Sequence, residues 1–117
     1  MALPDGPVLV VDDEPEIRAV VREYLCLTGR EVLEASNGLE ALWAVKHQRP
    51  PLVLLDLSMP RLGGLETIRH IRKFDPSIRV VVVTGQLSEA DSTRLEELGV
   101  AAIIKPLPLS VLDELFA

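Results

Sequence analysis

Apolar residues gather in four short, uninterrupted runs along the chain, and a polar residue follows each run. The runs are Val8–Val11, Leu52–Leu55, residues 80–83 and Ala101–Ile104. Continuous apolar runs of this length are typical of strands that are covered on both faces, as in a parallel sheet. A fifth and more polar segment, residues 31–35, predicts a strand at an edge of that sheet.

Helical patterns separate these strands. The first helix is expected to begin near Pro15, which suits a first helical turn, and to end at Gly29. Its apolar face follows the helical spacing of Ile17, Val20, Val21, Tyr24 and Leu25. Cys26 lies among these apolar residues, so we expect its thiol to be buried and unreactive.

Capping signals and apolar spacing predict four further helices. Asn37 and Glu40 predict an N-cap and capping box for the second helix, while Ser88 opens the fourth and Gly99 ends it. Apolar positions that mark these helices are Leu39, Leu42 and Trp43 in the second, Leu65, Ile68 and Ile71 in the third, and Leu95 and Leu98 in the fourth. Trp43, at helical spacing with Leu39 and Leu42, is expected to pack in the core or near the surface. A last helix would carry Val111, Leu112, Leu115 and Phe116.

Five strands that alternate with five helices predict one α/β domain over residues 1–117. Its sheet would be five-stranded, parallel and doubly wound, with helices on both faces. Such folds bind ligands beyond the carboxyl ends of their strands. The strands of this chain run into Asp12-Asp13, Asp56, Thr84 and Lys105, so we expect these side chains to converge at one edge.

Three carboxylates at one edge repel one another, and a divalent cation would relieve that repulsion. Ligands that are all oxygen atoms, in a shallow and wet position, suit Mg²⁺. A carboxylate that acts as nucleophile, next to a fixed ammonium (Lys105) and a hydroxyl (Thr84), suits phosphoryl transfer to an aspartate. The pattern therefore predicts an aspartyl-phosphate site.

Composition narrows the setting of this chemistry. The chain has 12 basic and 18 acidic residues, a net charge of −6, which argues against direct binding of nucleic acid or of anionic membranes. No apolar stretch reaches the length of a membrane span, and residues 1–6 lack the profile of a signal peptide. Cys26 is the sole cysteine and can form no internal disulfide. We therefore expect a cytoplasmic protein.

Four segments together resemble a known family. Residues 8–15, 54–60, 83–85 and 104–106 are similar to the motifs of the receiver domain of bacterial two-component response regulators. The resemblance extends over nearly the whole chain, from about Val8 to Phe116. It implies a flavodoxin-like sheet with the strand order 2-1-3-4-5, which agrees with a polar second strand at an edge.

The resemblance also implies a role for each site residue. Asp56 would accept a phosphoryl group from a sensor histidine kinase or a phosphotransfer protein. Asp13, Asp56 and the backbone carbonyl of Ser58 would ligate Mg²⁺, and Asp12 would reach the ion mainly through water. Thr84 would bind the phosphoryl oxygens, and Lys105 would pair with their charge. The peptide bond from Lys105 to Pro106 would be cis. Ser58 and Gln86 would tune the hydrolysis of the phosphoryl group. A downstream effector protein or output domain would respond, and a dimer could form through the face of the fourth helix, fifth strand and fifth helix.

The chain departs from the family pattern at three places. Gly63-Gly64 stands where Asp-Gly is commoner, which implies a more flexible loop. The stretch before Lys105 is one residue shorter than usual, and the position of the family's switch aromatic falls on Ala102. The last helix is expected to be short, and we expect no output region after it. We therefore expect the response to pass through the loop of residues 85–87 and the fourth helix.

Each motif alone has an ordinary structural explanation. Asp12-Asp13 could simply favour a helix start, Thr84-Gly85 could be a turn, and Lys105 could be a solvated lysine. The chain could be a free-standing signalling switch, which is not an enzyme, or a receiver excised from a hybrid histidine kinase or a transcription factor. The same residues could also belong to a Mg²⁺-dependent phosphatase or phosphotransferase with Asp56 as nucleophile, or to a binding module that is never phosphorylated.

Overall fold

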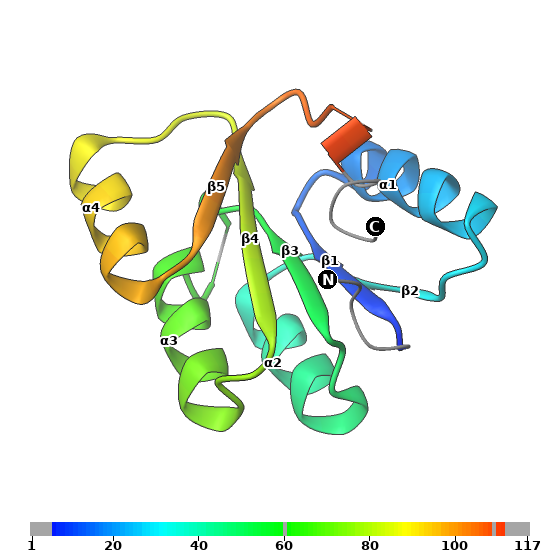
Figure 1. Cartoon of the computed structure of the whole chain (residues 1–117), viewed down its shortest axis with the longest axis horizontal. Helices are drawn as coiled ribbons and strands as arrows, with labels where there is room; N and C mark the ends of the chain where they lie inside the picture. Colours follow the sequence, from blue (N-terminus) through cyan, green and yellow to red (C-terminus); the bar gives the residue numbers. More distant parts are fainter. Residues whose placement is uncertain (1–5, 60, 109, 112–117) are drawn as a thin grey trace.

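The computed structural model describes residues 6–59, 61–108 and 110–111. Its elements are β1 (Val8–Val11), α1 (Pro15–Leu27), β2 (Val32–Ala35), α2 (Gly38–Gln48), β3 (Leu52–Leu55), α3 (Gly64–Phe74), β4 (Arg79–Thr84), α4 (Glu89–Leu98) and β5 (Ala101–Ile104). The five strands form one parallel sheet in the order β2-β1-β3-β4-β5 (Figure 1). The predicted fold class and strand order are confirmed. The predicted fifth helix falls mostly on residues 112–117, which lie outside the described residues.

The two faces of the sheet are covered by different helices. Alternate residues of each strand point to opposite faces. In β1, for example, Leu9 and Val11 join the buried cluster that includes residues of α2, α3 and α4. Val8 and Val10 join a second cluster with Val21 and Leu25 of α1, on the face where Figure 1 places that helix. Burial on both faces explains why these strands read as continuous apolar runs.

Two helix starts follow the predicted caps, with one difference. The Asn37 side chain accepts a hydrogen bond from the Glu40 amide at 3.0 Å, and the Ser88 hydroxyl accepts one from the Asp91 amide at 3.1 Å. The Glu40 carboxylate, however, accepts from the amide and hydroxyl of Ser36, at 2.7 and 2.8 Å, rather than from the Asn37 amide. Both hydrogen bonds lower the pKa of Glu40, and the bond from the Ser36 amide contributes more than the bond from its hydroxyl.

The expected burial is wrong at two positions of α1. Val20 is 53% exposed, and Cys26 is exposed because it lies about 100° around α1 from the buried Leu25. In α2, Leu39 and Trp43 are 52% and 60% exposed, and the Trp43 ring stacks on His47, so Trp43 takes the near-surface position of its two expected ones. The buried face of α2 consists of small or β-branched residues: Gly38, Ala41, Ala44 and Val45.

No helix in the described part of the chain is long and apolar enough to cross a membrane.

Two glycines permit close approaches around the loop that follows β3. A Cβ atom on Gly38, at the start of α2, would collide with the Thr67 hydroxyl oxygen and lie 2.5 Å from the carbonyl oxygen of Leu62. A Cβ atom on Gly64, at the start of α3, would lie 2.6 Å from the Cα of Leu57 and 3.0 Å from the carbonyl oxygen of Asp56. These contacts hold the starts of α2 and α3 against the loop.

We expect Gly38→Ala to destabilise the protein by about 1–3 kcal/mol, because the added methyl group would force the Leu62 backbone or Thr67 to move. Helix propensity alone predicts the opposite, a gain of about 0.5–1 kcal/mol. Gly63→Asp is a useful contrast, because nothing lies within 4 Å of a Cβ there and the residue is an N-cap without a side-chain bond. That variant should gain a few tenths of a kcal/mol. Urea denaturation measures both changes, and a stabilised Gly38→Ala would contradict the packing argument.

Candidate functional site

The backbone hydrogen bonds of the sheet continue one residue past three of its strands. The Asp12 amide donates to Ala35 O at 3.1 Å, the Asp56 amide to Val11 O at 2.9 Å, and the Lys105 amide to Thr84 O at 2.8 Å. Each of these three residues therefore has its main chain fixed by a neighbouring strand. The convergence that the sequence predicted rests on this regular extension of the ladder.

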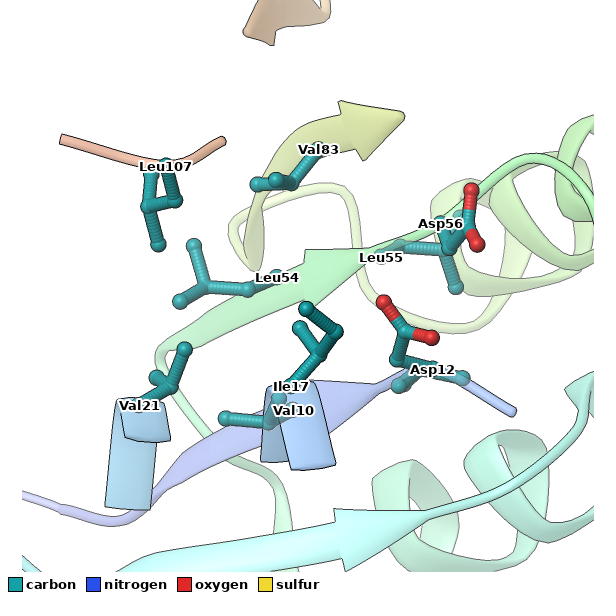
Figure 2. A pocket seen from close by; sticks show the side chains of 10 residues that line it. Val10, Asp12, Ile17, Val21, Leu54, Leu55, Asp56, Val83 and Leu107 are labelled. Atoms are coloured by element: carbon teal, nitrogen blue, oxygen red, sulfur yellow. The ribbon is translucent and has the colours of Figure 1, made fainter. Parts of the chain in front are cut away.

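Two of the three carboxylates are buried at this edge. Asp12 and Asp56 are 3% and 4% exposed, whereas Asp13 is exposed. Figure 2 shows the side chains of Asp12 and Asp56 next to each other at one end of an apolar pocket, whose other labelled residues include Val10, Leu54 and Val83. Each of the three carboxylates offers an oxygen within 4.8 Å of the others. Like charges this close repel strongly where the surroundings are poor in water.

Lys105 supplies the opposing charge. Its Nζ lies 2.8 Å from Asp12 Oδ2, 3.3 Å from Asp56 Oδ2 and 3.4 Å from Glu14 Oε1. Partial burial alone would lower the pKa of Lys105, but its bond to Asp12 and the charges of Asp12 and Asp56 outweigh that effect. The pKa of Lys105 therefore lies above its usual value, and its ammonium stays charged at neutral pH. The peptide bond from Lys105 to Pro106 is cis, as the resemblance implied.

Backbone amides hold the other carboxylate oxygens. Oδ1 of Asp12 accepts from the Glu14 amide at 2.9 Å, and Oδ1 of Asp56 accepts from the Ser58 amide at 3.2 Å. The Arg18 guanidinium donates to the carbonyl of Asp12 at 2.7 Å and fixes the start of the β1–α1 loop. In both aspartates, one oxygen faces an amide and the other faces Lys105.

Thr84 and Ser58 occupy different positions relative to the carboxylates. Thr84 is 1% exposed, and its hydroxyl donates to Gln86 O at 3.2 Å rather than to Asp56. Ser58 is exposed and contacts Asp56 through its amide. Sequence reasoning missed Glu14 as a third anion on Lys105, although it directly follows Asp12-Asp13.

The donor set suits a metal ion. The three carboxylates supply only oxygen atoms, and oxygen-only sites favour hard divalent cations such as Mg²⁺, Ca²⁺ or Mn²⁺. Asp13 is exposed and would leave an ion at this edge open to water. The chemistry of the acidic triad is therefore compatible with a metal ion that keeps open coordination positions.

Comparison with known proteins agrees with this geometry. The sequence profile of the response regulator receiver domain matches residues 8–116. The chain belongs to this family. The receiver domain is 37% identical over 94 residues to sporulation initiation phosphotransferase F of Bacillus subtilis, which covers 79% of this chain and 74% of that protein. Its fold matches the crystal structure of a response regulator receiver protein from Pseudomonas putida, with a TM-score of 0.88, 32% identity, and coverage of 96% of this chain and 95% of that one.

Some relatives are much longer than this receiver domain. It is 40% identical over 104 residues to protein-glutamate methylesterase/protein-glutamine glutaminase 3 of Hahella chejuensis, which covers 86% of this chain but 30% of that protein. The shared part is the receiver domain, a phosphoacceptor of phosphorelay signalling and not a classical enzyme. Membership of the family implies histidine kinases or phosphotransfer proteins as partners.

We expect Lys105→Met to destabilise the receiver domain by about 1–3 kcal/mol when no divalent cation is present, because Asp12 and Asp56 would be left without a counter-charge. Lys73→Met is the matched control, since Lys73 is exposed on the last turn of α3 and should change stability by less than about 0.5 kcal/mol. Thermal and urea unfolding in the presence of a chelator measure both. Equal stabilities of Lys105→Met and Lys73→Met would show that the lysine does not offset the carboxylate repulsion.

Proposed function

We propose that Asp56 is the residue that accepts the phosphoryl group, and that the single domain of residues 1–117 works as a switch that responds to this modification. The observation that carries the proposal is the pairing of one lysine with two buried carboxylates. Lys105 lies closer to Asp12, at 2.8 Å, than to Asp56, at 3.3 Å. Asp12 therefore takes the larger share of the ammonium charge, which leaves Asp56 Oδ2 the freer nucleophile.

The proposed reaction transfers a phosphoryl group from a histidine of the donor protein to Asp56. An oxygen of Asp56 forms a bond to phosphorus while the bond from phosphorus to the histidine nitrogen of the donor breaks, and that nitrogen keeps the electron pair. The charge that builds on the phosphoryl oxygens needs fixed cations and donors close by. Lys105 supplies a cation, and the Ser58 amide, which donates to Asp56 Oδ1, supplies a donor.

The proposed metal ion is Mg²⁺. Asp13, Asp56 and the backbone carbonyl of Ser58 would hold it, and Asp12 would contact it through water. When bound, Mg²⁺ would supply positive charge that offsets the charge of the phosphoryl oxygens. The support is the oxygen-only acidic triad and its exposed member, Asp13, because Mg²⁺ retains several waters and uses few protein carboxylates.

Thr84 is the proposed link from the site to the surface. Its hydroxyl is bonded to Gln86 O, so an anion at Asp56 offers it a stronger, charged acceptor. A change of partner would release the loop of residues 85–87, which leads into α4. In α4 Leu95 is the buried residue of the helix, so this helix is weakly anchored. Ala102 carries no ring that could move with Thr84. Ser58 and Gln86, which follow Asp56 and Thr84 by two residues, would tune the hydrolysis of the aspartyl phosphate.

The proposed partners are a sensor histidine kinase or a phosphotransfer protein as donor, and an effector protein or output domain as target. Contact with the target, or a dimer, would use α4, β5 and the residues after them. The acidic net charge of −6 supports protein partners over nucleic acid or membrane. The sole cysteine is compatible with the cytoplasm, where we place the domain. The domain would act alone or as part of a hybrid kinase or transcription factor.

Incubation with acetyl phosphate and Mg²⁺ should add one phosphoryl group to the chain, and Asp56→Asn should abolish the addition. Asp13→Asn should slow it strongly, because the metal loses a ligand. Intact-mass spectrometry measures the labelling. Asp75→Asn is the matched control, since Asp75 is an aspartate outside the site that bonds Ser77, and it should label like the parent. Undiminished labelling of Asp56→Asn would disprove the assignment.

Phosphorylation should increase amide exchange across residues 85–98 more than around Ala102. Thr84→Ala should accept the phosphoryl group and show little of this change, because the alanine cannot respond to the new anion. Thr84→Ser keeps the hydroxyl and should preserve the response. Hydrogen–deuterium exchange of each phosphorylated variant against its unmodified form measures the effect. Changes centred on Ala101–Ile104, or a full response in Thr84→Ala, would contradict this route.

A further inference from the structure

Glu14 is a third anion against Lys105, and the proposed chemistry does not use it. Its Oε1 lies 3.4 Å from Nζ, a distance close to the 3.3 Å from Nζ to Asp56 Oδ2. The Glu14 side chain is 61% exposed, whereas that of Asp56 is 5% exposed. The ammonium of Lys105 is therefore shared between a buried acceptor and a carboxylate at the surface.

The position of Glu14 in the chain makes this contact unusual. Glu14 is the N-cap of α1, yet its side chain makes no capping hydrogen bond. Short side chains such as Asp, Asn, Ser and Thr are preferred at this position because they reach the free amides of the first turn. A residue that breaks such a local preference is expected at sites where function requires it. The Glu14 amide bonds Asp12 Oδ1 at 2.9 Å, which anchors the residue next to the buried carboxylates.

We propose that Glu14 is a positioning residue that competes with Asp56 for Lys105 and thereby slows phosphoryl acceptance. This inference rests on the proposed function of Asp56. Lys105 has to turn its charge toward the incoming phosphoryl oxygens. An interaction that is made in the resting state and weakened during the reaction raises the barrier. Because the Glu14 side chain is 61% exposed and water screens its charge, its effect on the rate is a factor of a few rather than of hundreds.

Three variants separate the reach of the side chain from its charge. Glu14→Gln keeps the length of the side chain and removes the charge. Glu14→Asp keeps the charge but shortens the reach to Lys105. Glu16→Gln is the matched control, because Glu16 is an exposed acid in the first turn of α1 for which no ion pair is found within residues 6–59, 61–108 and 110–111.

The measurement is the rate of labelling by acetyl phosphate at saturating Mg²⁺, followed by intact mass. Both Glu14 variants should be labelled about twofold to fivefold faster than the parent, as expected for the loss of one exposed ion pair. Glu14→Gln should be at least as fast as Glu14→Asp, since it also removes repulsion of an anionic donor. Glu16→Gln should match the parent. Glu14→Asp should also melt at a higher temperature, because aspartate is a good N-cap, so its faster labelling could not come from a loosened fold.

Two outcomes would overturn the inference. Glu14 variants that label no faster than Glu16→Gln would show that Lys105 is not restrained by Glu14. A faster Glu14→Gln with an unchanged Glu14→Asp would show that charge alone matters and that no competition for the lysine takes place. A parent chain that is not labelled at Asp56 would instead refute the proposed function, so the two failures are distinguishable.

Discussion

The contact of the Lys105 ammonium with Asp12 and Asp56 is the interaction on which the arrangement of this receiver domain depends. It joins residues that follow β1, β3 and β5, so it crosses most of the sheet. Two carboxylates that are almost fully buried would repel each other and lose hydration, and both costs oppose folding. The lysine reduces those costs. The Lys105 ammonium can also attract an added anion at this edge, and the three carboxylates can attract a metal cation.

The order of the strands makes this contact possible. β1 and β3 are neighbours, which places Asp12 beside Asp56, while β4 lies between β3 and β5. Lys105 therefore has to reach past the end of β4, where Thr84 lies buried and its carbonyl accepts a hydrogen bond from the Lys105 amide. The long lysine side chain spans this gap. A shorter side chain after β5 would leave the two carboxylates without the lysine counter-charge, although each would keep its backbone amide.

Sequence reasoning was most successful where the determining interactions are local or follow from strand direction. The strand ends, the caps at Asn37 and Ser88, and the convergence of Asp12, Asp56 and Lys105 all belong to this class. Burial on the helices was less predictable, because apolar spacing does not reveal which side of a wide stripe the sheet covers. Helix α2 packs through Gly38 and its small residues, so Trp43 stays outside. The contact between Glu14 and Lys105 was missed because Glu14 is the N-cap of α1, where the direction of β1 no longer fixes the position of the side chain.

Thr84 connects the charged edge with the loop before α4, which has the fewest buried residues among the described helices. Its carbonyl accepts a hydrogen bond from the Lys105 amide. Its hydroxyl donates one to the carbonyl oxygen of Gln86, in the loop before α4. Helices α1, α2 and α3 each bury two or more residues, whereas the buried residue of α4 is Leu95. A helix with so little buried apolar surface costs less free energy to displace than its neighbours. We therefore propose that a change of charge at Asp56 reaches the outside of the domain through Thr84 and α4, because α4 has the fewest buried residues among the described helices.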